Sequence, residues 1–163
     1  MVILVLLLCT GLASCQRQAP PVKTVTARID RADEEILRIA EEARNTLPGF
    51  FRQLGRADSS DGNFCVKYPF RADSGSGVIM EQVWLTGIHF KNGGYYGVLA
   101  GAPQHLNDMK KGDMVTFYAD EISDWMYIRG GKIAGGRSIK YLLEQIPESR
   151  RSNEQRNILQ MFE

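Results

Sequence analysis

The chain has 163 residues, of which 44% are hydrophobic and 24% are charged, and its formal net charge at pH 7 is +1. This length accommodates one ordinary domain with an appendage, but not two separate cores. A nearly neutral chain lacks the field needed to neutralise several phosphates at once, so the composition argues against a nucleic-acid-binding protein.

The first residues resemble a bacterial lipoprotein signal. Val2–Leu8 is an unbroken apolar run, too short to span a bilayer as a helix but as long as the core of a secretory signal. The sequence Leu-Ala-Ser-Cys at residues 12–15 then resembles a lipobox, whose cysteine carries the lipid after cleavage. We therefore predict a signal peptide at residues 1–14, lipidation at Cys15, and attachment to a membrane through that lipid. The alternatives are an ordinary signal peptide and a short hydrophobic anchor.

The residues after the predicted cleavage site suggest an address and a tether. Gln16, rather than Asp, follows Cys15, which resembles the outer-membrane sorting pattern of Gram-negative lipoproteins. The predicted location is therefore the cell envelope, on the periplasmic face of the outer membrane. Residues 15–27 are rich in Pro and polar residues, so we expect a tether there. We expect a single α+β domain at residues 28–147 and a helical tail at 148–163.

The first predicted helix follows the tether. Apolar residues between Ile36 and Leu47 recur at spacings of three and four, the period of an amphipathic helix. Acidic residues at 33–35 suit its first turn. Pro48-Gly49 should end or kink this helix, although the apolar stripe continues through Phe50–Leu54.

The middle of the chain has the alternation typical of strands. Asn92-Gly93 and Gly130-Gly131 each separate two such segments, which predicts two tight hairpins. Pro69 cannot donate to a ladder, so we expect the end of the first strand at a sheet edge. The expected strands are Phe64–Phe70, Ile79–Lys91, Tyr95–Ala100, Met114–Tyr118, Ile122–Ile128 and Lys132–Ala134.

Two short helices are predicted after the strands. Ser138–Gln145 has a helical apolar stripe, and we expect the Ser138 hydroxyl to cap it. Ser152 and Gln155 fit a capping box for a last short helix. The order of elements predicts an α+β fold, a curved antiparallel sheet of about five to six strands packed on an N-terminal helix, with short C-terminal helices.

Six short motifs form a series between residues 33 and 144. They are Val66-Lys67, Glu81-x-Val83-Trp84-Leu85, Gly97-Val98-Leu99 with Pro103, Gly112-Asp113-x-Val115, Ile122-x-Asp124-Trp125-Met126 and Gly135-Gly136-x-Ser138. The series resembles an uncharacterised bacterial family, the domain of unknown function numbered 2314. The resemblance implies a small α+β domain, often secreted or anchored, and no established activity. Gln82 stands where the family usually has His, and Arg137 where it usually has an aromatic residue.

Asp124 interrupts an otherwise apolar strand beside Trp125, so it is either a buried structural group or part of a site. We expect its carboxylate to be buried and held by a basic side chain or backbone N–H groups, with Arg137 as first choice of partner and Lys67 as second. For the tryptophans, packing in the sheet is the alternative to ligand contact. The candidate binding residues are Asp124, Trp125, Trp84, Arg137 and Glu81.

A nucleophilic enzyme needs a thiol or hydroxyl, a base, and a group that orients the base. The sequence offers Cys65, with His89 or His105 as base and Asp124 or Glu81 as orienting group, but no spacing requires these residues to meet. Cys65 is the single cysteine after Cys15, so no disulfide is expected within the domain. A free cysteine usually packs as a small hydrophobic residue.

No metal site or cofactor is predicted, because the two histidines lie apart and no ligand pair has metal-binding spacing. Gly135–Ser138 opens a helix whose N–H groups could hold an anion, and close packing of the glycines is the alternative. We predict a lipid-anchored, non-catalytic domain that binds a protein or an envelope component, and no nucleic acid. The alternatives are a hydrolase that uses Cys65 or an acidic pair, and an immunity- or inhibitor-like protein.

Overall fold

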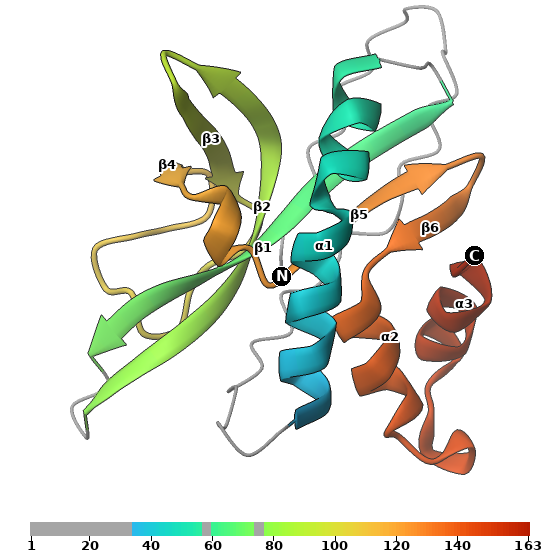
Figure 1. The fold of residues 1–163 in the computed structure, drawn as a ribbon. Helices are drawn as coiled ribbons and strands as arrows, with labels where there is room; N and C mark the ends of the chain where they lie inside the picture. The colour runs from blue at the N-terminus through green and yellow to red at the C-terminus, as the bar shows by residue number, and fades with distance from the viewer. Residues whose placement is uncertain (1–33, 57–59, 74–76) are drawn as a thin grey trace, which may run out of the picture.

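Figure 1 shows the computed structural model of the chain, which describes residues 34–56, 60–73 and 77–163. The predicted signal peptide at 1–14, the predicted lipidation site Cys15 and the predicted tether at 15–27 lie outside the described residues. Within them, the chain folds as one sheet with a long N-terminal helix and short C-terminal helices. The prediction of an α+β fold is confirmed.

The sheet is antiparallel throughout and strongly twisted (Figure 1), and its six strands lie in the order β4-β3-β2-β1-β5-β6. All paired strands but one pair are also consecutive in sequence. The exception is β5, which pairs with the first strand. This pairing brings the last hairpin next to the centre of the sheet. The strands are β1 (Asp61–Asp73), β2 (Val78–Lys91), β3 (Gly94–Leu99), β4 (Met114–Phe117), β5 (Asp124–Arg129) and β6 (Lys132–Gly135).

The two predicted hairpins are present. Asn92 and Gly93 join β2 to β3 with φ angles of 51° and 82°, and Gly130 and Gly131 join β5 to β6 with φ angles of 52° and 82°. Two successive residues with positive φ form the turn whose twist matches a β-hairpin. The prediction for Pro69 is only partly right, because β1 is an inner strand. Its pairing with β5 ends at Lys67, however, so Pro69 lies where that side of β1 has no strand partner.

One helix, α1 (Glu34–Arg56), covers one face of the sheet. The sequence predicted an end or a kink at Pro48-Gly49, and the helix does not end there. Proline removes an intrahelical hydrogen bond, but Leu47 and Phe50 on either side are buried in the core, and this packing offsets the loss.

The opposite face is covered by α2 (Arg137–Glu144) and α3 (Asn153–Met161), so β5 is buried on both faces. The predicted capping box of Ser152 and Gln155 begins α3. The 3-10 turns η1 (Ala119–Glu121) and η2 (Glu148–Arg150) connect neighbouring elements. The chain end packs on the sheet, where Phe162 forms a parallel bridge with Ile133. The C-terminal residues are therefore part of the packed structure.

Candidate functional site

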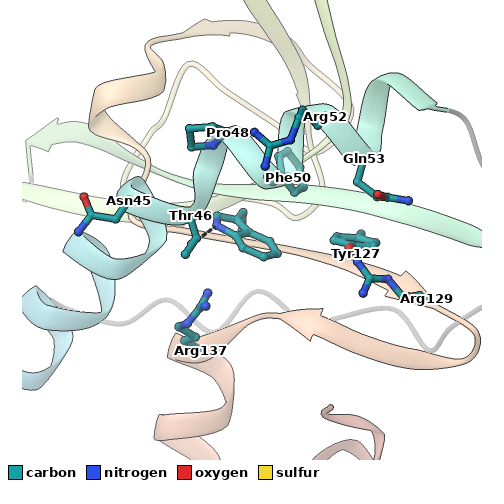
Figure 2. Close-up of a pocket in the computed structure, with 11 residues that line it drawn as sticks. Asn45, Thr46, Pro48, Phe50, Arg52, Gln53, Tyr127, Arg129 and Arg137 are labelled. Atoms are coloured by element: carbon teal, nitrogen blue, oxygen red, sulfur yellow. Dashed lines mark hydrogen bonds between the residues drawn. The ribbon is translucent and has the colours of Figure 1, made fainter.

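The surface carries an open groove of about 540 Å³ where α1 meets the β5–β6 hairpin and the start of α2 (Figure 2). Three arginines line it, one from each of α1, β5 and α2. The described lining contains no acidic residue, lysine, histidine or cysteine. The lining residues are Asn45, Thr46, Pro48, Gly49, Phe50, Arg52, Gln53, Trp125, Tyr127, Arg129 and Arg137.

The floor of the groove is aromatic and fixed in place. Trp125 and Tyr127 lie two residues apart on β5, on the same face, with ring centroids 6.1 Å apart. Phe50 of α1 packs against Trp125 at 5.5 Å. The Trp125 Nε1–H donates to the carbonyl of Ala43 at 3.0 Å and to the Thr46 hydroxyl at 3.1 Å, which ties β5 to α1. A buried indole normally needs such a partner, so the floor is rigid.

Arg137 forms the α2 side of the groove. Its guanidinium lies 5.3 Å from the centre of the Trp125 ring, and its Nε donates to Glu42 of α1 at 2.9 Å. Its Nη1 is buried and has no hydrogen-bond partner among the described residues. The Asp61 Oδ1 and Trp84 Nε1 atoms are likewise buried without a partner among the described residues.

The other two arginines lie on the other sides of the groove (Figure 2). Arg129 lies over the Tyr127 ring at 5.1 Å and donates to the Tyr127 hydroxyl, and its Nη1 is 4.0 Å from Glu163. Arg52 is exposed and makes no ion pair within the described part of the chain. The groove therefore presents positive charge on several sides of an aromatic floor.

Asp124 lies beneath this floor and is completely buried. Its Oδ1 accepts the backbone N–H of Trp125 at 2.8 Å, and its Oδ2 accepts the N–H of Ser138 at 2.8 Å. The carboxylate therefore caps α2, the helix that begins with Arg137. The first choice of partner was wrong, because Arg137 pairs with Glu42 instead. The prediction that the Ser138 hydroxyl caps α2 was also wrong. The N-cap residue of α2 is Gly136, which has no side chain to cap it.

The possible anion site at the start of α2 is thus filled by the protein itself, because Asp124 occupies the Ser138 N–H. Close packing, the alternative that the sequence offered, accounts for Gly135: a Cβ there would lie 2.2 Å from the Trp125 carbonyl oxygen. No group of three or more potential metal ligands gathers anywhere in the described residues.

The sequence is similar to a family of bacterial proteins. Residues 33–158 match the profile of a family described as "Uncharacterized protein conserved in bacteria (DUF2314)". The chain belongs to the DUF2314 family. No solved structure matches it at a significant level.

Two curated relatives of this DUF2314 chain are similar in sequence. The "Putative ankyrin repeat protein NMB1133/NMB1171" of Neisseria meningitidis serogroup B is 35% identical over 76% of this chain and 51% of that protein. The "Uncharacterized protein YegJ" of Escherichia coli K12 is 33% identical over 66% of this chain and 67% of that protein. The chain thus spans about half the length of the Neisseria relative.

Three of the six sequence motifs, those that contain Lys67, Asp124 and Ser138, meet at Asp124. Lys67 of β1 is buried, and its Nζ donates to the Ser138 hydroxyl at 3.1 Å. Burial lowers the pKa of Lys67, and the nearby Asp124 carboxylate opposes that shift. Burial raises the pKa of Asp124, and hydrogen bonds from Ser138 and the charge of Lys67 oppose it. Lys67, the second-choice partner, therefore supplies the nearby positive charge, without a direct ion pair.

The other sequence-predicted residues lie away from the groove. Trp84 is buried on the α2 side of the sheet, with Lys67 Nζ 5.9 Å from its ring centre. Glu81 is buried and accepts the backbone N–H groups of Gln104 and His105, at 2.5 Å and 2.8 Å, so it holds the loop after β3. Of the five candidates, only Trp125 and Arg137 meet in the groove.

Gln82, which the sequence comparison by motif singled out, is buried and accepts a hydrogen bond from the Ser123 hydroxyl at 2.6 Å.

Cys65 is surrounded by apolar residues on the α2 side of the sheet. Burial raises the pKa of its thiol to about 11. A nucleophilic cysteine needs the opposite shift and an adjacent base. The Cys65 thiol forms hydrogen bonds with the Asn63 carbonyl and with Thr86. The His89 ring is hydrogen-bonded to the Gly87 carbonyl instead. This geometry disfavours Cys65 as a nucleophile.

Sequence reasoning missed two of the three arginines that line the groove, Arg52 and Arg129. Arg129 could have been found, because it follows Trp125 and Tyr127 at a spacing of two and must share their face. Arg52 could not, because its place depends on how α1 lies across β5, which no local pattern encodes.

Proposed function

We propose that this chain is a lipid-anchored protein of the bacterial cell envelope that acts by binding, and that the arginine-lined groove is its binding site. The observation that carries the binding role is the set of three guanidinium groups around a rigid aromatic floor. One of them has a buried nitrogen without an acceptor in the described structure. Such a site attracts an anionic group.

The lining favours binding over catalysis. The hydroxyl of Thr46 already bonds to Trp125 and to the backbone of α1, and the described lining supplies no thiol, imidazole or carboxylate to move a proton. Guanidinium groups keep their charge at any physiological pH, so they recognise anions but do not act as bases.

The anchor is supported by sequence alone. The apolar run at Val2–Leu8 and the lipobox-like residues 12–15 support lipidation at Cys15 and a position at the periplasmic face of the outer membrane. No helix in the described residues is long and apolar enough to cross a membrane.

The anchor is tested by expressing the native sequence and the Cys15→Ser variant in a Gram-negative host. We expect the native protein in the outer-membrane fraction, labelled by a palmitate analogue, and the variant unlabelled. Equal labelling of both proteins would contradict the lipidation site.

The binding role is tested by site-specific photo-crosslinking in intact cells. A photo-reactive residue at Asn45, exposed beside the groove, should capture an envelope component. The same residue at Leu37, exposed on α1 but outside the groove, is the matched control and should not. The Asn45 product should disappear when Arg137 is changed to Gln. Capture that is the same at both positions, or that ignores Arg137→Gln, would refute the role of the groove.

A further inference from the structure

The dimensions of the groove point to the kind of anion it binds. Its α1 side runs from Asn45 to Gln53, and the eight helical rises between these residues correspond to about 12 Å. An extended peptide rises roughly 3.3 Å per residue, so about four residues fit along this side. The charges belong to three separate elements and are spread around the groove (Figure 2). A single small anion would contact only one or two of them.

The existing contacts of the arginines show which anion suits them. Arg137 binds the carboxylate of Glu42 through Nε, at 2.9 Å, so its Nη2 remains for a second acceptor. Its Nη1 is buried and becomes available to a ligand only if the side chain shifts. The planar guanidinium fork matches a carboxylate with two parallel hydrogen bonds. Arg129 has only a marginal contact with a carboxylate, 4.0 Å from Glu163 at the rim. Both arginines can therefore bind a further carboxylate without breaking a strong ion pair within the protein.

Amide side chains stand at the two ends of the groove. Asn45 is exposed at one end (Figure 2), and Gln53 at the other donates its Nε2 to Asp61 at 2.5 Å, which leaves its carbonyl oxygen as an acceptor. Amides pair with peptide N–H and C=O groups.

We propose that the ligand of the groove is an extended acidic segment of a partner protein, whose Asp or Glu side chains bind Arg137, Arg129 and Arg52. This inference rests on the binding role proposed above and names its ligand. The aromatic floor packs against the stems of the bound residues, while the amides at the two ends hold the peptide backbone.

The test is isothermal titration calorimetry with the full chain, purified in a non-ionic detergent. The probe is a short acetylated peptide that alternates glutamate and alanine, and the control peptide has glutamine in place of glutamate. Only the glutamate peptide should bind. Arg137→Gln and Arg52→Gln should each weaken binding about tenfold, as expected for the loss of one hydrogen-bonded charge contact. Arg44→Gln, a change at an exposed arginine of α1 outside the groove, should leave the affinity unchanged.

Two further probes separate this inference from the proposed function. Inorganic phosphate and glycerol 3-phosphate represent a lipid headgroup, and they should bind more weakly than the glutamate peptide. If either phosphate binds more tightly than the glutamate peptide, and Arg137→Gln abolishes that binding, the ligand is not an acidic peptide. The groove then keeps its proposed role as a binding site. Equal binding of the two peptides, or a response to Arg44→Gln equal to that of Arg137→Gln, also overturns the inference. If no probe binds and the Asn45 crosslink is absent, the proposed function fails as well.

Discussion

Replacing Asp124 with alanine tests the support beneath the groove. The carboxylate is completely buried and accepts two backbone N–H groups, those of Trp125 and Ser138. Alanine leaves both donors without an acceptor in a place that water does not reach. It also removes the negative charge that offsets the burial of the Lys67 ammonium.

The magnitude follows from these contacts. Each stranded buried donor costs about 1–3 kcal/mol, so the two together should lower the free energy of unfolding by about 2–6 kcal/mol. A domain of this size is typically stable by roughly 5–15 kcal/mol, so this loss is a large share of its stability. Asp124→Asn keeps one oxygen acceptor but loses the charge, and it should cost less, about 1–3 kcal/mol.

Urea unfolding, followed by tryptophan fluorescence at neutral pH, measures both variants against the parent. Asp120→Ala is the matched control, because Asp120 is exposed and should change the stability by less than about 0.5 kcal/mol. If Asp124→Ala unfolds at the same urea concentration as Asp120→Ala, the carboxylate does not cap α2 and the reasoning is wrong.

Three further predictions follow from the packing. Because Cys65 is buried, its thiol should react with a thiol reagent at neutral pH only as fast as the protein unfolds locally. Fast labelling of the folded protein would restore the hypothesis of a cysteine enzyme. Because burial raises the pKa of this thiol to about 11, stability should be lost as the pH rises from about 9 through about 11, a loss that Cys65→Ala should reduce in an alkaline urea series. Gly135→Ala should destabilise the protein more than Gly130→Ala: both have positive φ, but only a Cβ at Gly135 meets the Trp125 carbonyl, at 2.2 Å. Equal melting temperatures for the two alanine variants would refute the packing argument.

Local patterns predicted the elements of this fold well. The apolar stripe of α1, the alternation of β1 and the two hairpin turns are encoded by residues next to one another in sequence. Pro48 is the exception, because a helix breaker yields when the residues around it are buried against a sheet.

The candidate site was harder to predict, because it depends on contacts between elements. The sequence indicated that Asp124 would be buried, but Arg137 was the wrong partner, since the side chain that follows Gly136 turns toward Glu42 of α1. The order β2-β1-β5 brings Lys67 next to Asp124, and this long-range pairing has no local signal.

The two tryptophans give the most direct test of the groove, because Trp125 lies in its floor and Trp84 is buried on the other face of the sheet. Their indole N–H groups are separate signals in a ¹⁵N-correlated NMR spectrum of the full chain. Titration with the glutamate peptide should shift the Trp125 indole signal progressively and leave that of Trp84 in place. A shift of Trp84 alone, or shifts elsewhere with Trp125 unmoved, would contradict the assignment of the groove as the binding site.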